Sequence, residues 1–184
     1  VLKEGKTVNI KDYSIPWKND LKGSAPIVAV LATCMDSGKT SLICKIAEYF
    51  KNDGLNIAAA KLTGVAFMQD PFKMKDNGID LVIDFVDAGL PSTCGNKEDA
   101  IAAACGVITE INKAKPDIIL VEFGDGIIGE YNVQSIITHP SFKKHIIMTV
   151  VAANDLMAAW GAKKKLEELG LRADLFTGPV VNSQ

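Results

Sequence analysis

Residues 32–41 read Ala32-Thr33-Cys34-Met35-Asp36-Ser37-Gly38-Lys39-Thr40-Ser41. The run that leads into this stretch, residues 27–32, is entirely apolar, as in a strand buried on both faces of a sheet. After it, apolar residues recur with helical spacing as far as Phe50, and residues 52–54 (Asn-Asp-Gly) are a helix stop signal. The sequence therefore predicts a buried strand, a short polar loop and an amphipathic helix in direct succession.

A loop in this setting is typical of a phosphate-binding loop, or P-loop. Its backbone N–H groups and the helix dipole would converge on an anion, and Gly38 would let the backbone approach phosphates closely. Lys39 would reach the β- and γ-phosphates, and the Thr40 hydroxyl would ligate Mg²⁺. The usual pattern has Gly where this chain has Thr33, so a chance Gly-Lys-Thr at a helix start is the alternative. The residues expected to contact nucleotide in this loop are Thr33, Cys34, Met35, Asp36, Ser37, Gly38, Lys39, Thr40 and Ser41.

The rest of the chain alternates between strand-like and helix-like segments. This alternation predicts one α/β domain with a mostly parallel sheet between two helical layers, that is, a three-layer α/β/α P-loop fold. Residues 1–25 are polar and rich in Gly and Pro, and we interpret them as a lead-in segment or linker before a nucleotide-binding domain at 26–184. The expected strands are 27–32, 55–62, 79–86, 117–123, 145–152 and 173–176, with 179–182 beginning or extending the last one. The expected helices follow the loop and cover 97–115, 132–138 and 155–169, and residues 63–78 form a polar loop or short helix.

Composition narrows the classes of partner. The 184 residues include 20 Lys and Arg against 22 Asp and Glu, a net charge of −2, which argues against a protein built to grip nucleic acid. No run reaches the ~18 apolar residues of a membrane span. The four cysteines lack CxxC spacing and there are two histidines, so we expect reduced thiols and a cytoplasmic location.

Ligands of open parallel sheets bind at the carboxyl ends of the strands, so the residues that follow each strand are candidates. Glu122 follows four apolar residues, which is the arrangement of a Walker-B carboxylate that binds Mg²⁺ beside the P-loop. Lys61 ends an apolar strand, where burial is costly unless the ammonium faces an anion; the alternative is a lysine that reaches solvent. Gly124 and Gly126 would let the backbone approach a substrate.

Other carboxylates have two open readings each. Asp125 is either a second catalytic carboxylate or a turn residue. Asp84 and Asp87, with nearby hydroxyls, either bind substrate or cap local structure. Asp155, beside Asn154, either helps to read a base edge or caps the helix that follows.

Several of these stretches resemble dethiobiotin synthetase. Residues 32–40 are similar to its Gly-Thr-Asp-x-x-x-Gly-Lys-Thr loop, with Ala32 in place of the first Gly and Cys34 in place of Asp. Residues 61–64 (Lys-Leu-Thr-Gly) resemble its Lys-Pro-Val-x-x-Gly run, and residues 121–126 (Val-Glu-Phe-Gly-Asp-Gly) resemble its Val-Glu-Gly-Ala-Gly-Gly run. Over most of residues 5–180, including 84–95, the chain also resembles a group of uncharacterised bacterial and archaeal proteins that are distant relatives of that enzyme.

The resemblance implies ATP-dependent activation of a small carboxylate or carbamate. It implies that Lys61 holds the acid, that Asp70 serves Mg²⁺ and that Asn182 reads adenine; Asp76 and Asp80 compete with Asp70 because the loop lengths differ. It further implies a homodimer as one assembly, and an N-terminal domain that precedes this part in the longer relatives.

The function expected from residues and resemblance together is Mg²⁺-nucleotide binding with phosphoryl transfer or hydrolysis. Lys39, Lys61 and Glu122 would be catalytic, Thr40, Glu122 and Asp70 would hold Mg²⁺, and a small-molecule substrate would meet Lys61, Asp87 and Asp125. The guanine signature Asn-Lys-x-Asp is absent, which favours ATP over GTP. The alternatives are a nucleotide-dependent switch or assembly factor acting on a protein or metallocofactor partner, and a degenerate domain that binds nucleotide without chemistry.

Overall fold

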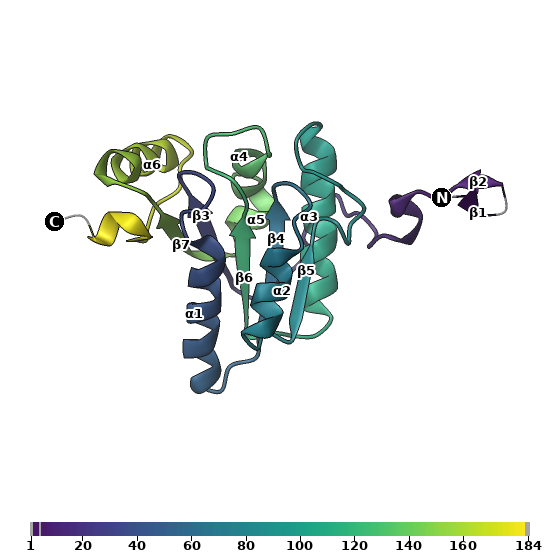
Figure 1. Cartoon of the computed structure of the whole chain (residues 1–184), viewed down its shortest axis with the longest axis horizontal. Helices are drawn as coiled ribbons and strands as arrows, with labels where there is room; N and C mark the ends of the chain where they lie inside the picture. The colour runs from purple at the N-terminus through teal and green to yellow at the C-terminus, as the bar shows by residue number, and fades with distance from the viewer. Residues whose placement is uncertain (1, 4, 183–184) are drawn as a thin grey trace.

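The computed structural model describes residues 2–3 and 5–182. Its centre is a six-stranded sheet with the order β5-β4-β6-β3-β7-β8, in which every neighbouring pair is parallel (Figure 1). The predicted α/β class with a parallel sheet is thus confirmed. The strands are β3 (Ile27–Ala32), β4 (Ile57–Thr63), β5 (Leu81–Asp84), β6 (Ile118–Phe123), β7 (Ile146–Ala152) and β8 (Leu175–Thr177).

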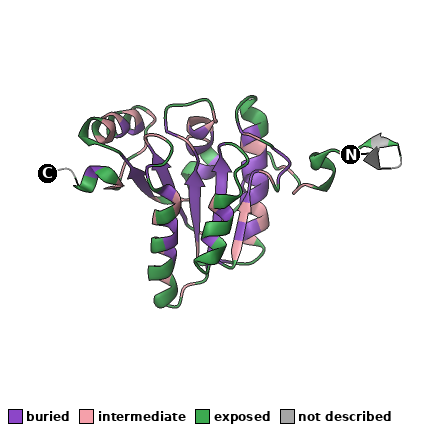
Figure 2. Cartoon of the chain, in the orientation of Figure 1, coloured by how far each residue is buried: buried purple, intermediate pink, exposed green. Residues whose placement is uncertain are grey.

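Helices cover both faces of the sheet, which makes three layers. Alternate strand residues point to opposite faces, so the all-apolar central strands feed two separate cores. One core joins the sheet to α1 and α2, and the other joins it to α3, α4, α5 and α6. Figure 2 shows the central strands as the most continuously buried part of the chain. The helices are α1 (Lys39–Asn52), α2 (Gln69–Asp76), α3 (Lys97–Asn112), α4 (Val133–Ile137), α5 (Pro140–Lys143) and α6 (Leu156–Glu168).

The strand order places the loop at residues 33–38 at the carboxyl end of an inner strand, β3. Strand β3 lies between β6 and β7, whereas the chain that leaves β3 next enters β4, on the far side of β6. The connection that leaves β3 therefore runs to one side of the strand, whereas β7 lies on its other side. Open α/β sheets bind ligands in the crevice at the carboxyl end of such a strand.

The prediction that residues 179–182 begin or extend the last strand is wrong. Residues Pro179–Asn182 form a 3-10 turn, η2, instead of beginning or extending β8. Pro179 has no N–H to donate to a sheet ladder, and the chain turns so that Val180 N–H donates to the Ala153 carbonyl at the end of β7. The short helix α5, which follows His139, was also not predicted.

The segment 1–25 contains local structure and packs on the domain over its second half. Strands β1 (Leu2–Lys3) and β2 (Lys6–Thr7) pair antiparallel, and η1 (Ile10–Tyr13) is a 3-10 turn. Figure 1 shows the strand pair at the opposite end of the molecule from the C-terminus. Further along, the Trp17 indole donates to the Ala88 carbonyl at 2.6 Å, and Leu21 is fully buried in the core that includes residues of α3 to α6. Residues 15–25 are therefore an integral part of the domain surface.

Among the described helices, none combines the length and the apolar composition that crossing a membrane requires.

A substitution at Gly106 tests whether residues 15–25 pack on α3. A Cβ at Gly106 would lie 2.6 Å from the Pro16 carbonyl oxygen, so we expect Gly106→Ala to lower the free energy of unfolding by roughly 1–3 kcal/mol. Gly161→Ala, in α6, is the matched control because its Cβ meets nothing within 4 Å, and it should be neutral or stabilising. Chemical denaturation measures both; equal stability of the two variants would show that the segment does not pack on α3 in solution.

Candidate functional site

The start of α1 is open to an anion. Its N-cap is Gly38, which has no side chain to satisfy the first N–H groups of the helix, and the first turn contains no acidic residue. The starts of α3 and α6 are different, because the side chains of Asn96 and Asp155 accept backbone hydrogen bonds there. Free N–H groups and the helix dipole at α1 favour a bound phosphate.

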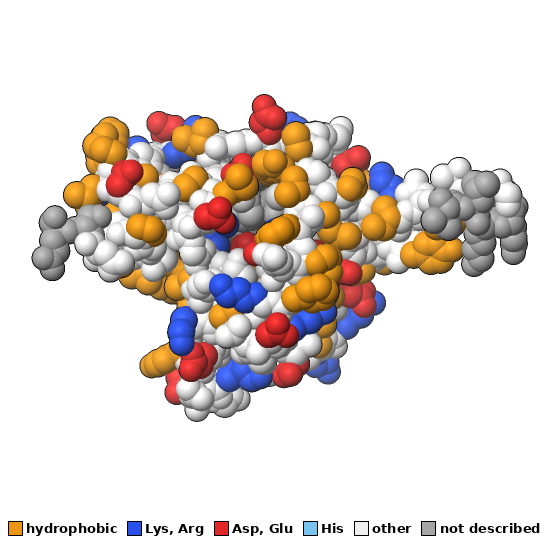
Figure 3. Space-filling model, in the orientation of Figure 1, with side chains coloured by type: hydrophobic (Ala, Val, Ile, Leu, Met, Phe, Trp, Pro, Cys, Tyr) orange, Lys and Arg blue, Asp and Glu red, His pale blue; other side chains and the backbone are white. Residues whose placement is uncertain are grey.

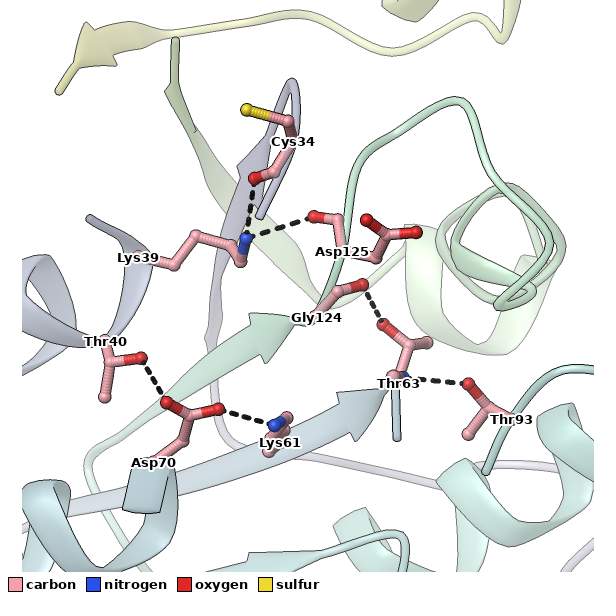
Figure 4. A network of polar contacts seen from close by, with 10 residues as sticks. Cys34, Lys39, Thr40, Lys61, Thr63, Asp70, Thr93, Gly124 and Asp125 are labelled. Carbon is pink, nitrogen blue, oxygen red and sulfur yellow. Dashed lines mark hydrogen bonds and ion pairs between the residues drawn. The ribbon is translucent and has the colours of Figure 1, made fainter. Parts of the chain in front are cut away.

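Lys39 is the first residue of α1 and its ammonium is folded back over the loop (Figure 4). Its Nζ donates to the carbonyl oxygens of Cys34 and Asp125, at 3.1 Å each. The side chain is buried, and burial lowers the pKa of Lys39, while the nearby carboxylates of Glu122 and Asp125 oppose that shift. Neutral carbonyls are modest partners for a buried cation, so this ammonium is available to phosphate oxygens.

Three ionisable side chains lie in one row across neighbouring strands. In the register of the sheet, Lys61 of β4 stands opposite Glu122 of β6 on one side and Asp84 of β5 on the other. Residues paired in this way share a face of the sheet, and here it is the face that α1 and α2 cover. The row places one positive charge between two acidic groups below the P-loop.

Asp70 links this row to the P-loop (Figure 4). It lies in the first turn of α2; its Oδ1 accepts from the Thr40 hydroxyl at 3.0 Å and its Oδ2 lies 2.5 Å from Lys61 Nζ. Lys61 is only 4% exposed, so the burial cost predicted from the sequence is offset by this ion pair. Asp76 is exposed at the other end of α2, and Asp80 pairs with Lys51; neither lines the pocket.

Glu122 is 2% exposed, and its Oε2 has no hydrogen-bond partner among the described residues. Burial raises the pKa of Glu122 to about 7, the nearby Asp70 carboxylate adds to the rise, and a hydrogen bond with Thr40 and the charge of Lys61 oppose it. A buried carboxylate with a free oxygen is the kind of group that a cation would stabilise.

The donor set fits a Mg²⁺ ion that arrives with a nucleotide. In the part of the chain that the structure describes, no three His, Cys, Asp or Glu side chains converge to hold a metal by themselves. Protein-bound Mg²⁺ in nucleotide sites typically takes one or two carboxylates and fills its shell with phosphate oxygens and water. The Thr40 hydroxyl and the unpartnered oxygen of Glu122 would supply the protein ligands, with Asp70 beside them.

A pocket of about 530 Å³ joins these groups, and Figure 3 shows it as a hollow near the middle of the molecule's face. Charged side chains line its floor and hydrophobic side chains border it on one side. The P-loop and α1 contribute Met35, Asp36, Gly38, Lys39, Thr40 and Ser41. The segment from the end of β4 through α2 contributes Lys61, Gly64, Val65, Phe67, Gln69, Asp70 and Lys73, and the segment from the end of β6 onward contributes Glu122, Gly124, Asp125 and Tyr131.

Gly124 and Gly126 allow close backbone packing within the protein, and Gly124 also lines the pocket. A Cβ at Gly124 would collide with the Thr63 carbonyl oxygen, and one at Gly126 would lie 2.7 Å from the Thr33 carbonyl oxygen. These glycines let the loop after β6 pass close to the end of β4 and to the P-loop. They serve backbone packing within the protein, which brings the Asp125 carbonyl to Lys39.

Thr93 belongs to the hydroxyl cluster that the sequence offered either as substrate-binding or as capping structure, and its observed contacts are structural. Its hydroxyl accepts from Gly64 N–H at 2.9 Å and donates to the Tyr131 carbonyl at 2.8 Å, and Asn132 Nδ2 donates to the Thr93 carbonyl at 2.7 Å. One buried side chain thus ties together the loops that follow β4, β5 and β6. The sequence offered the Pro91-Ser92-Thr93 hydroxyls as a signal, but the partners of the Thr93 hydroxyl are 29 and 38 residues away.

Several candidate residues do not line the pocket, namely Thr33, Cys34 and Ser37 of the P-loop and Asp84, Asp87, Asp155 and Asn182 elsewhere. Asp87 is exposed, and its carboxylate accepts from Asp84 N–H at 2.9 Å; Asp84 in turn accepts from Val86 N–H, so the pair caps the turn after β5. Burial raises the pKa of Asp84, and the charge of Asp87 adds to the rise. Asn182 is exposed in η2 beside the end of β7. Asp155 caps α6, with its Oδ1 accepting from Ala158 N–H at 2.8 Å.

The side of the P-loop toward β7 holds a further polar group. Asn154 Nδ2 lies 3.2 Å from Cys34 Sγ, and Thr33 N–H donates to the Ala152 carbonyl at 3.0 Å. The ends of β7 and of β8, with the turn η2, therefore form the rim next to the P-loop on the side opposite β4.

No protein-family model matches the chain, and a search of curated proteins gave no match. Solved structures share the fold. The signal recognition particle receptor FtsY from Elizabethkingia anophelis superposes with a TM-score of 0.56 at 12% identity, over 87% of this chain and 52% of that one. FtsY from Thermotoga maritima gives 0.53 at 14% identity, over 87% of this chain and 54% of that one. The hydrogenase maturation factor HypB from Archaeoglobus fulgidus gives 0.51 at 18% identity, over 83% and 64%.

These neighbours confirm the predicted P-loop NTPase-like fold. The chain spans between 52% and 64% of the length of these three proteins, and identities of 12–18% carry the fold alone. The closer resemblance to dethiobiotin synthetase remains a prediction.

The raised pKa of Glu122 predicts an unusual dependence of stability on pH. Between the unfolded value of 4.5 and about 7 the folded state holds the extra proton, so the free energy of unfolding falls as pH rises through this window, by about 3 kcal/mol at most. In Glu122→Gln this contribution disappears, and the loss of stability from pH 5.5 to 8 should be smaller than in the wild type. Urea denaturation at both pH values measures it; identical pH slopes would contradict the buried, protonated state of Glu122.

Proposed function

We propose that the chain binds a Mg²⁺-nucleoside triphosphate on the P-loop and transfers or hydrolyses its terminal phosphoryl group. The observation that carries this proposal is the convergence of the uncapped start of α1, Lys39, Thr40 and the free oxygen of Glu122 in one pocket. The neighbours with a P-loop fold support it, and the degenerate alternative is disfavoured because each of these groups is in place.

The residues would act mainly by positioning and by neutralising charge. Lys39 would leave the Cys34 and Asp125 carbonyls for phosphate oxygens and stabilise the negative charge of the transferred group. Mg²⁺, when bound with the nucleotide, would neutralise further phosphate charge. Glu122 would lose its proton as the cation arrives, since burial and Asp70 hold its pKa near 7.

ATP is the nucleotide that we propose. The Asn-Lys-x-Asp guanine signature is absent, and Asn154 with the turn η2 lines the rim on which a base would lie. An FtsY structure from Elizabethkingia anophelis that shares the fold holds GDP, so both nucleotides belong in the test.

The acceptor that we propose is a small carboxylate or carbamate held by Lys61. The acid oxygen would attack the terminal phosphorus, the bond to the nucleoside diphosphate would break, and a mixed anhydride would form. Support comes from the burial of Lys61 beside the P-loop and from the resemblance of residues 61–64 to dethiobiotin synthetase.

A nucleotide-dependent switch or assembly factor is the second candidate. Two large apolar side chains that line the pocket, Met35 and Phe67, are 64% and 49% exposed. A partner could contact them and sense the state of the loops. This candidate draws support from two proteins that share the fold, FtsY, a signal recognition particle receptor, and HypB, a hydrogenase maturation factor.

Calorimetry with ATP and GTP, with and without Mg²⁺, tests the nucleotide site. We expect Mg²⁺-dependent binding of ATP that Lys39→Ala weakens at least about 100-fold, because a buried charge-assisted contact is lost. Lys45→Ala, an exposed lysine on the same helix, should bind as the wild type does. If the Lys39→Ala and Lys45→Ala variants bound ATP equally well, the P-loop would not be the nucleotide site.

Product formation separates the two candidates. For the ligase-like reaction, a small carboxylic acid should raise ADP formation at least about tenfold, and Lys61→Ala should abolish the rise while exposed Lys75→Ala keeps it. For the switch, ADP formation stays slow with every acid tested and rises only with a protein partner. A rise that persists in Lys61→Ala would contradict the assignment of Lys61.

A further inference from the structure

The pocket is lined by a third lysine, Lys73, in addition to Lys39 and Lys61. Lys73 lies on α2, one turn after Asp70, and its side chain is exposed. Its Nζ donates to the hydroxyl of Ser41, in the first turn of α1, at 2.7 Å. The side chain therefore reaches from α2 to the start of α1, where phosphate is proposed to bind.

The three lysines of the pocket differ in the partners that their ammonium groups have. Lys61 forms an ion pair with Asp70 at 2.5 Å, so its charge is already compensated. Lys39 donates to two backbone carbonyls and Lys73 donates to a hydroxyl, and neither forms an ion pair within the part of the chain that the structure describes. Neutral oxygens are weaker partners for an ammonium than anionic oxygens are. Lys39 and Lys73 are therefore the two cations of the pocket that an incoming polyanion can engage.

The charge of the pocket makes a second free cation important. Four carboxyl side chains line the pocket beside the three lysines, namely those of Asp36, Asp70, Glu122 and Asp125. The triphosphate of a nucleotide is itself a polyanion, and like charges at short range repel strongly in a partly buried site. Each ammonium without an anionic partner therefore has a direct effect on how tightly the phosphates are held.

The position of α2 indicates which phosphate Lys73 would meet. Strand β7 lies on one side of the P-loop strand β3, and β6 and then β4 lie on its other side. A nucleotide with its base toward β7 runs its phosphates across the P-loop toward β6 and β4, and α2 follows β4 in the chain. Ser41, which holds Lys73, is the neighbour of Thr40, and a metal at Thr40 would bridge the outer two phosphates. Lys73 is thus at the end of the site where the terminal phosphate lies.

We propose that Lys73 is a second phosphate-binding cation, which leaves the Ser41 hydroxyl for an oxygen of the terminal phosphate. Lys39 would hold this phosphate from the P-loop side, and Lys73 would hold it from α2. Because a nucleoside diphosphate lacks the terminal group, Lys73 would engage a triphosphate and not a diphosphate. The inference rests on the proposed function and adds to it a residue from outside the P-loop that distinguishes the two states of the nucleotide.

Calorimetry with two nucleotides tests the proposal without any turnover. A non-hydrolysable ATP analogue and ADP, each with Mg²⁺, would be compared on the wild type, Lys73→Ala and Lys75→Ala. We expect Lys73→Ala to weaken the analogue at least about tenfold, because a charge-assisted contact is lost, and to leave ADP binding within about twofold. Lys75, an exposed lysine on the same helix that does not line the pocket, is the matched control, and Lys75→Ala should bind both nucleotides as the wild type does.

Lys73→Arg separates a role of the charge from a role in packing. It keeps a positive charge that can bind phosphate, so it should recover most of the affinity for the analogue that Lys73→Ala loses. A merely structural role would lower the affinity for the analogue and for ADP alike.

The outcomes separate this inference from the proposed function. If the wild type binds the analogue and Lys73→Ala affects the analogue and ADP equally, or affects neither, the inference fails and the nucleotide site stands. If the wild type binds neither nucleotide, the proposed function fails, and inorganic tripolyphosphate then decides the inference. Weaker binding of tripolyphosphate by Lys73→Ala than by Lys75→Ala supports Lys73 as a phosphate-binding residue, and equal binding or no binding overturns it.

Discussion

The site depends on the burial of three ionisable side chains at the carboxyl ends of neighbouring strands. They are Lys39, Lys61 and Glu122. Their exposed fractions are 7%, 4% and 2%, and each buried charge costs several kcal/mol unless a partner offsets it. Backbone carbonyls offset the cost of burying the Lys39 ammonium, and Asp70 offsets the cost of burying Lys61. Glu122 instead takes a pKa near 7. Because none of these arrangements is as good as a phosphate or a cation would be, the site is stabilised by the ligands that it is proposed to bind.

The parts that could be predicted are those whose signals lie within a short stretch of chain. The strand, loop and helix around residues 27–52 follow from one apolar run, one Gly-Lys-Thr and one helical period. Lys61 and Glu122 could be singled out because a charged residue at the end of an apolar strand is conspicuous. The parallel sheet then brings such residues to one edge, and the structure places Lys61 opposite Glu122 in register.

The parts that could not be predicted depend on contacts between distant segments. Residues 15–25 resemble a linker in composition. However, Leu21 is buried in the core, and the absence of a side chain at Gly106 lets the segment pack closely on α3. Thr93 looks like one of several loop hydroxyls until three loops meet at it. Asp87 resembles a site carboxylate because it follows a strand, but β5 is the edge strand and its end lies away from the P-loop. In each case the deciding information is which distant segments of the chain lie together, and this is not local.

The most direct test of this account is a crystal structure with Mg²⁺ and a non-hydrolysable ATP analogue. The account predicts that Lys39 Nζ leaves the carbonyls of Cys34 and Asp125 for the terminal phosphate, with the metal at Thr40 and Glu122. It also predicts the base on the β7 side and an open space over Lys61. A nucleotide bound elsewhere, or Lys39 still on the two carbonyls with phosphate present, would contradict it.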